Sequence, residues 1–248
     1  MEEENTMYTN KAIISRSKDV RMGGLGRAYV RLRSSPSFEP MSKDEFFFSM
    51  LDIVSENQDI QKVERLKRQA KLPYPCAEVS DFDLKQQPSI KRSQVEHLLS
   101  LNWIAKGQHL VIHGSVGKDK IKFGCGFANH AIEQMHPTEH LEFNQLIFEL
   151  RLAQKNNELT ELFEKLSKLD LLMLSNWHLD ELELVDMYLL FSLLETVLPS
   201  LSLLITSDPP IQEWANSLDE PLLSSRLTEL VCDNVRELKF REVTKVSH

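Results

Sequence analysis

A short apolar run, Leu110–His113, leads into a loop that contains Gly114 and Gly117. The segment after the loop is rich in small residues, namely Gly124, Cys125, Gly126 and Ala128. The apolar run predicts a buried strand, and the small residues predict a closely packed helix. The two glycines permit a tight turn between these elements. A strand, a glycine turn and a helix in this order favour folds built on a parallel sheet.

The alternation of short apolar runs with helical patterns continues to the end of the chain. We expect strands near residues 110–113, 140–143, 170–174, 201–206 and 236–240, and helices near residues 120–134, 145–154, 158–167, 183–197 and 221–231. Strands that alternate with helices predict βαβ units. The fold class is therefore α/β, with a parallel sheet flanked by helices.

The first 72 residues have a different pattern. Ser42 and Glu45 are spaced as a helix capping box, and the apolar residues Phe46–Phe48 after it are expected to be core residues. We expect the helical pattern to break near Asn57 and to end at Pro73. These features predict a small helical N-terminal region (1–72), a proline-rich linker or collar (73–92) and an α/β domain (93–248).

The chain has 248 residues with 29 basic and 37 acidic side chains. Its overall net charge of −8 does not favour binding to nucleic acid. Two clusters are nevertheless basic: residues 11–35 hold seven cations and one acid, and residues 62–71 hold five cations and one acid. Such clusters can neutralise DNA phosphates, or they can be solvated helix faces or contacts with the acidic segment 93–248. The candidate DNA contacts are Arg27, Arg31, Arg33, Lys62, Arg65, Lys67 and Arg68.

The three cysteines form no plausible disulfide framework, and no segment has the ~20 apolar residues of a membrane helix. The N-terminus is acidic and does not match a secretion signal. We therefore expect a cytoplasmic protein without a membrane partner.

The loop after the first predicted strand resembles the Walker A pattern GxxxxGK[ST], in which backbone amides and a lysine hold phosphates. Gly114, Gly117 and Lys120 fit this pattern. Asp119 replaces the glycine before the lysine, and Ile121 replaces the hydroxyl that binds magnesium. The candidate nucleotide-binding residues are Gly114, Ser115, Val116, Gly117, Lys118, Asp119, Lys120 and Ile121. Lys118 is also placed to reach a phosphate.

Five segments in the same order resemble the IstB-type transposition helper proteins, which are relatives of the DnaC helicase loader among the AAA+ ATPases. They are Met22–Tyr29 with Phe46–Leu51, Asn102–Ile104, Leu169–Leu179, Leu203–Trp214 and Asp219–Val231. The resemblance implies a P-loop NTPase (AAA+-like) fold. It also implies subunits that assemble into homo- or hetero-oligomers, and contacts with DNA and a transposase.

The resemblance places Ser175 and Asn176 where the family carries its Walker B acids, and Asp208 in the sensor-1 region. The family's arginine near the C-terminal helix falls on Glu229. Without these groups we expect no catalytic residue, no ATP hydrolysis, no tight ATP binding and no bound magnesium. The leading function is an assembly protein for DNA transposition. The alternative is an interaction module that regulates an active AAA+ paralogue without touching DNA, and a working ATPase with an unusual site ranks last.

Two further groups of residues are not expected to form a functional site. His136 and His140 are four residues apart, but Pro137 breaks a shared helical face and no third ligand is near, so we expect no metal site. Trp177 and Trp214 favour a packing role over base stacking.

Overall fold

The computed structural model describes residues 9–36, 40–115, 117–180, 182–214, 221–232 and 234–241. The chain divides into two compact units, residues 1–64 and 65–248. None of the described helices is long and apolar enough to cross a membrane. Helix α3 crosses the boundary between them, and the other elements belong to one unit each.

The first unit is helical. It contains α1 (Asn10–Asp19), α2 (Gly23–Arg33) and the first part of α3 (Lys43–Ala70). The predicted capping box is present, because the Glu45 amide donates to Ser42 Oγ at 3.2 Å and the Ser42 amide donates to Glu45 Oε2 at 2.7 Å. Tyr29 and Phe46 pack edge to face, with ring centroids 5.4 Å apart.

Two predictions for the third helix are wrong. The helix has no break at Asn57, whose side-chain amide donates to the Ile53 carbonyl at 2.6 Å while the backbone stays helical. Phe47 and Phe48 are not core residues, since they are 52% and 65% exposed. Phe46, one helical position earlier, packs on Tyr29 of α2, whereas Phe47 and Phe48 contact each other on the exposed side of the helix.

The second unit is an α/β sandwich around one five-stranded sheet with the order β2-β3-β4-β1-β5. The strands are β1 (His109–His113), β2 (Thr138–Glu142), β3 (Leu171–Trp177), β4 (Ser202–Ser207) and β5 (Val235–Lys239). The helices are α4 (Arg92–Leu99), α5 (Asn102–Ala105), α6 (Gly117–Glu133), α7 (Phe143–Asn156), α8 (Leu159–Leu166), α9 (Leu184–Val197), α10 (Ile211–Trp214) and α11 (Pro221–Cys232). All four strand pairings are parallel, which confirms the predicted sheet.

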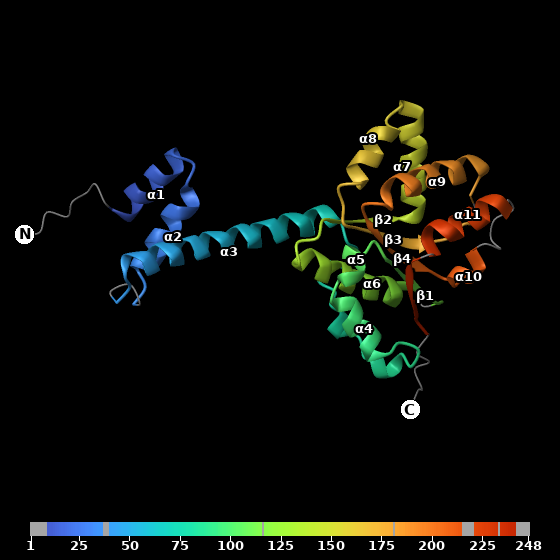
Figure 1. The fold of residues 1–248 in the computed structure, drawn as a ribbon, viewed down its shortest axis with the longest axis horizontal. Coiled ribbons are helices and arrows are strands. Elements are labelled where there is room, and N and C mark those ends of the chain that lie inside the picture. Colours follow the sequence, from blue (N-terminus) through green and yellow to red (C-terminus); the bar gives the residue numbers. More distant parts are fainter. Residues whose placement is uncertain are drawn as a thin grey trace, which may run out of the picture. The chain divides into compact units, whose positions relative to one another are not determined.

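Both faces of the sheet are covered (Figure 1), with α4 and α6 on one face and α7, α8 and α9 on the other. The three inner strands β3, β4 and β1 are accordingly almost entirely buried, as expected for a parallel sheet covered on both sides, whereas the edge strands β2 and β5 carry more polar residues. Helix α6 lies close to the sheet at Gly124, where an added Cβ would come within 3.1 Å of the side chains of Met173 and Leu204. The small residues of this helix therefore serve packing, as the sequence predicts.

The segment expected to be a linker or collar, residues 73–92, is folded within the second unit. It contains two short 3-10 helices, η2 (Val79–Asp81) and η3 (Leu84–Gln86), which form a collar beside α4 and α6. The buried Gln87 exchanges two hydrogen bonds of 2.8 Å with the backbone of Arg241. The unit also begins earlier than the expected domain boundary, at Arg65, because Leu66 and Ala70 of α3 are buried.

Candidate functional site

The loop after β1 forms the expected glycine turn between a strand and a helix. Strand β1 ends at His113, and α6 begins at Gly117. Gly114 has a φ of 138°, and a Cβ on it would lie 2.0 Å from the Phe240 carbonyl oxygen. Only glycine fits this position, because a side chain would clash with the backbone after β5. Val116, one of the candidate nucleotide-binding residues, lies outside the described residues.

Lys120 in the first turns of α6 is buried, with 1% of its side chain exposed. Its ammonium group donates to the carbonyl oxygens of Gly114 and Ser207, both at 2.7 Å, and to Asp208 Oδ1 at 2.5 Å. An ammonium group has three protons, so these three acceptors use its whole donor capacity. The protein's own oxygens thus take the place that the phosphate oxygens of a nucleotide would occupy on this lysine.

The neighbours of Lys120 differ in exposure. Ser115, Gly117, Lys118 and Asp119 are exposed at the mouth of the loop, and Ile121 is half-buried. Asp119 and the 76%-exposed carboxylate of Asp208 both place negative charge near the loop. Ile121 offers no oxygen to a metal ion, so a magnesium ion would find no ligand at this position.

The end of β3 lies at the same edge of the sheet, because β4 pairs with both β3 and β1. Ser175 is buried, and its Oγ lies 2.8 Å from His140 Nε2 of β2. Burial lowers the pKa of His140, which keeps its imidazole neutral at pH 7. Asn176 has a φ of 55° and donates through its side-chain amide to Glu142 Oε1 at 2.8 Å.

A histidine at the end of β1 completes this edge. The imidazole of His113 is buried, and its Nε2 lies 3.4 Å from Glu237 Oε1 of β5. Burial lowers the pKa of His113 although the Glu237 carboxylate opposes this shift. His136 and His140, which are four residues apart in sequence, have different partners. His136 contacts Asp170, whereas His140 contacts Ser175.

Trp177 and Trp214 are packing residues. Each is 1% exposed, and their ring centroids lie 5.3 Å apart inside the main apolar cluster of the second unit. Neither ring is available for stacking on a base, so the packing interpretation is confirmed. Arg226 in α11 forms an ion pair with Glu195 of α9.

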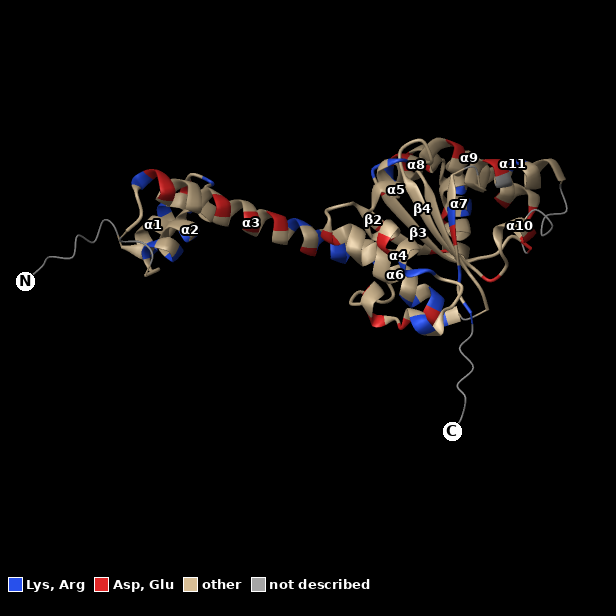
Figure 2. Ribbon diagram, turned by 60° about the horizontal axis from the view of Figure 1, so that its bottom comes forward, with Lys and Arg blue, Asp and Glu red and all other residues tan. Residues whose placement is uncertain are grey.

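The candidate DNA contacts are distributed over two helices. Arg27, Arg31 and Arg33 are exposed on α2, and Lys62, Arg65 and Arg68 are exposed on α3. Lys67 is half-buried, and its ammonium group lies 3.0 Å from Glu133 Oε1 at the end of α6. Lys67 is therefore partly neutralised within the protein (Figure 2 shows the basic and acidic segments).

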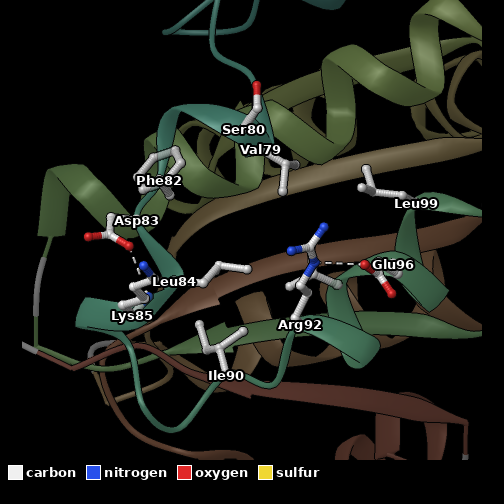
Figure 3. Close-up of a pocket in the computed structure, with 11 residues that line it drawn as sticks. Val79, Ser80, Phe82, Asp83, Leu84, Lys85, Ile90, Arg92, Glu96 and Leu99 are labelled. Carbon is white, nitrogen blue, oxygen red and sulfur yellow. Dashed lines mark hydrogen bonds and ion pairs between the residues drawn. The ribbon is translucent and has the colours of Figure 1, made fainter.

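The collar encloses a cavity of about 580 Å³ that contains none of the predicted site residues. Figure 3 shows its walls, which are formed by the collar on one side and α4 on the other. The lining is mainly apolar, with Phe82, Leu84 and Ile90 prominent, and the Arg92 guanidinium donates to Glu96 Oε1 at 2.8 Å at its edge.

A family model described as "IstB-like ATP binding protein" matches residues 15–240. The chain belongs to this IstB-like family. A relative from Pseudomonas fluorescens, described as an ATP-binding protein of the insertion sequence IS1162, is 28% identical to this IstB-like protein over 197 residues. The match covers 79% of this chain and 85% of the relative.

Solved structures show the same fold. DnaI has a TM-score of 0.52 at 20% identity, and the match covers 66% of this IstB-like chain and 91% of DnaI. AMPPCP-bound DnaA from Aquifex aeolicus has a TM-score of 0.54 at 16% identity, and the match covers 67% of this chain and 50% of that chain. At such identities the likeness shows the fold alone, and it confirms the predicted AAA+-like P-loop class.

Sequence reasoning named Lys120 and Asp208 but did not pair them. It also missed the contacts of Ser175 with His140 and of Asn176 with Glu142. These partners are 34 to 88 residues apart in sequence. No local pattern links them, because they meet only where the parallel strands end at one edge of the sheet.

Proposed function

We propose that this IstB-like protein is an assembly factor for DNA transposition that does not hydrolyse ATP. In this role it binds DNA, a transposase, or both, and its subunits associate without nucleotide turnover. Family membership supports the transposition role, and the loop geometry supports the loss of hydrolysis. The observation that carries the proposal is the triple engagement of Lys120, whose ammonium group is fully occupied by Gly114, Ser207 and Asp208.

ATP hydrolysis needs three groups that this chain replaces: the hydroxyl that binds the metal ion and the two Walker B acids. A metal ion needs oxygen ligands, and the attacking water needs a carboxylate to activate it. Ile121 and Ser175 replace the metal-binding hydroxyl and the first acid, and Ser175 is committed to His140. Asn176 stands at the position of the second acid, and its side-chain amide donates to Glu142 Oε1 at 2.8 Å. The loss of several groups that act together removes many orders of magnitude in rate.

The direct test is an ATPase assay with magnesium, combined with titration of a fluorescent ATP analogue. We expect phosphate release at the rate of the buffer control and weak or no analogue binding. Magnesium-dependent turnover that disappears in Lys120→Ala would refute the proposal and would support the third interpretation, a working ATPase with an unusual site. The circular dichroism spectrum of Lys120→Ala, compared with that of the wild type, shows whether the variant is folded.

A second candidate function is regulation of an active AAA+ paralogue without DNA contact. The acidic character of the second unit favours it, because residues 65–248 carry 20 basic and 26 acidic side chains. A surface that faces DNA is expected to be basic. Duplex binding that weakens as salt rises supports the first function. Stable co-purification with an intact paralogue, in the absence of any DNA binding, supports the second.

A further inference from the structure

Three lysines from two distant parts of the sequence line one cavity at the edge of the second unit opposite the loop after β1. Lys71 follows α3, whereas Lys165 and Lys168 lie at the end of α8 and just after it. The cavity has a volume of about 370 Å³, and its other walls come from Leu66, Gln69, Pro137, Thr138, Glu139 and Leu169. It lies at the amino ends of β2 and β3, because Thr138 and Leu171 pair there.

Glu139 holds two of the lysines in place. Its side chain is only 7% exposed, and its Oε1 lies 3.3 Å from Lys71 Nζ and 3.0 Å from Lys165 Nζ. The two lysines are 61% and 53% exposed, so they carry their charge to the solvent side of a buried carboxylate. Cations held in this way need little ordering when an anion binds.

The charges around the cavity do not cancel. The three lysines face one glutamate and the carboxyl ends of α3 and α8, each equivalent to roughly half a negative charge. The Asp170 carboxylate nearby is directed to His136 at 2.7 Å, and Lys67 is matched by Glu133. The side chains that line the cavity, together with the two helix ends, leave a surplus of about one positive charge. Asp170 lies outside the lining and adds a negative charge nearby, because His136 cancels it only when protonated. The unit as a whole has more acidic than basic residues.

The basic surface continues along α3. Arg65 and Arg68 are exposed on the last turns of that helix, and both precede Lys71 at intervals of three residues. Arg65 and Arg68 lie about 4.5 Å apart along the helix axis and on adjacent sides of the helix, and Lys71 follows directly after its end. Figure 2 colours basic residues along this end of α3 and at α8.

We propose that the cavity lined by Lys71, Lys165 and Lys168 binds phosphodiesters of a duplex DNA backbone, with Glu139 as the group that positions two of the lysines. This inference rests on the DNA-binding half of the proposed function and assigns it a place in the second unit. Because the lysines contact phosphates, binding here does not depend on base sequence.

The test is the salt dependence of binding to a fluorescent mixed-sequence duplex, measured by anisotropy from 50 to 200 mM salt with the full chain. Lys168→Gln and Lys71→Gln are each expected to make the plot of log affinity against log salt shallower by about one. The fourfold salt increase then weakens each variant roughly 3.5-fold less than the wild type. The same decrease in slope is expected on a second duplex of unrelated sequence.

Lys239→Gln is the matched control, since Lys239 is exposed on β5 at the opposite edge of the sheet from β2. Its slope is expected to equal that of the wild type. Thermal unfolding shows whether each variant is folded, and exposed Lys168 is the variant with the least structural risk. Wild-type binding with unchanged slopes in Lys168→Gln and Lys71→Gln overturns the assignment but leaves DNA binding in place. Absence of duplex binding by the wild type at 50 mM salt overturns both.

Discussion

At the scale of single residues, we expect the ion pair between Lys120 and Asp208 to limit the binding of anions at the loop after β1. The lysine is buried and the aspartate is exposed, so the aspartate covers the lysine from the solvent side. Asp208→Asn keeps the shape and one acceptor oxygen but removes the negative charge. We expect this variant to bind a fluorescent ATP analogue about tenfold more tightly than the wild type, a difference of about 1.4 kcal/mol.

The double variant Asp208→Asn with Lys120→Met serves as the control for that titration. It is expected to lose the gain, because the added affinity comes from the released ammonium group. Equal, weak binding by Asp208→Asn and the wild type would show that the ion pair does not limit nucleotide entry. ATP turnover is still not expected in Asp208→Asn, because Ile121 and Ser175 are unchanged.

The buried imidazole of His109 gives the free energy of unfolding a defined pH dependence. Burial lowers the pKa of His109 from its ordinary value of 6.5 to about 4, and its Nδ1 accepts a hydrogen bond from the Leu203 amide at 3.2 Å. The folded state therefore favours the neutral ring. The contribution is complete above pH 6.5 and decreases as the pH falls toward 4, by roughly 3 kcal/mol in total.

Urea unfolding at several pH values between 7 and 4 measures this effect. His109→Asn can retain an acceptor near the Leu203 amide but does not titrate. We expect the free energy of unfolding to fall less steeply with decreasing pH in His109→Asn than in the wild type. Parallel curves for the two proteins would mean that His109 takes up its proton without loss of the fold.

At the scale of elements, the contact between α1 and α2 depends on one glycine. A Cβ on Gly26 would lie 2.7 Å from the Ser17 Cβ, whereas a Cβ on Gly24 would have ordinary contacts of 3.6 Å or more with Val54. Gly26→Ala is expected to separate α1 from α2 and to speed hydrogen exchange of the α1 amides. Gly24→Ala is the matched control and is expected to leave exchange unchanged or slow it, because alanine favours a helix by about 1 kcal/mol. Equal exchange in both variants would contradict the close approach.

The elements of the second unit could be predicted because their patterns are local. Each of the five strands lies within three residues of its expected position, and so do the five helices expected after residue 116, whereas the short helix α10 was not expected. Residues 73–92 could not be assigned from pattern, since prolines and polar residues are common in linkers and in folded collars alike. The exposure of Phe47 and Phe48 was likewise missed, because a run of three apolar residues on a helix points in three directions.

The candidate site was predictable only in part for a related reason. The glycine turn is a local feature of the sequence and is present in the structure. The expected replacement of the Walker B acids by Ser175 and Asn176 is also read from local sequence and stays a prediction. The charge environment is not local: Asp208 reaches Lys120 through the pairing of β4 with β1, and Lys71 meets Lys165 through Glu139 of β2. Parallel sheets bring together residues from separate βα units, so such pairs require the fold.

At the scale of the whole molecule, the two units differ in what stabilises them. The main apolar cluster draws all its members from residues 111–235, so it contains no residue of the first unit. Helix α3 runs through the boundary between Glu64 and Arg65, and its buried residues, Leu66 and Ala70, fall after that boundary. The second unit should therefore keep its core when the first 64 residues are absent.

Deletion of residues 1–64 tests this expectation. We expect the shortened chain to unfold cooperatively on heating, with a midpoint within a few degrees of the corresponding transition of the full chain, because the main apolar cluster draws no residue from the deleted segment. A second deletion, of residues 1–71, is the informative comparison, since it also removes Leu66, Ala70 and the Lys71 contact with Glu139. This deletion is expected to lower the midpoint clearly, because two buried apolar side chains are lost and the buried Glu139 carboxylate loses one of its partners. Equal midpoints for the two deletions would place the boundary of the folding unit elsewhere than at Arg65. Loss of cooperative unfolding in the chain that lacks residues 1–64 would do the same.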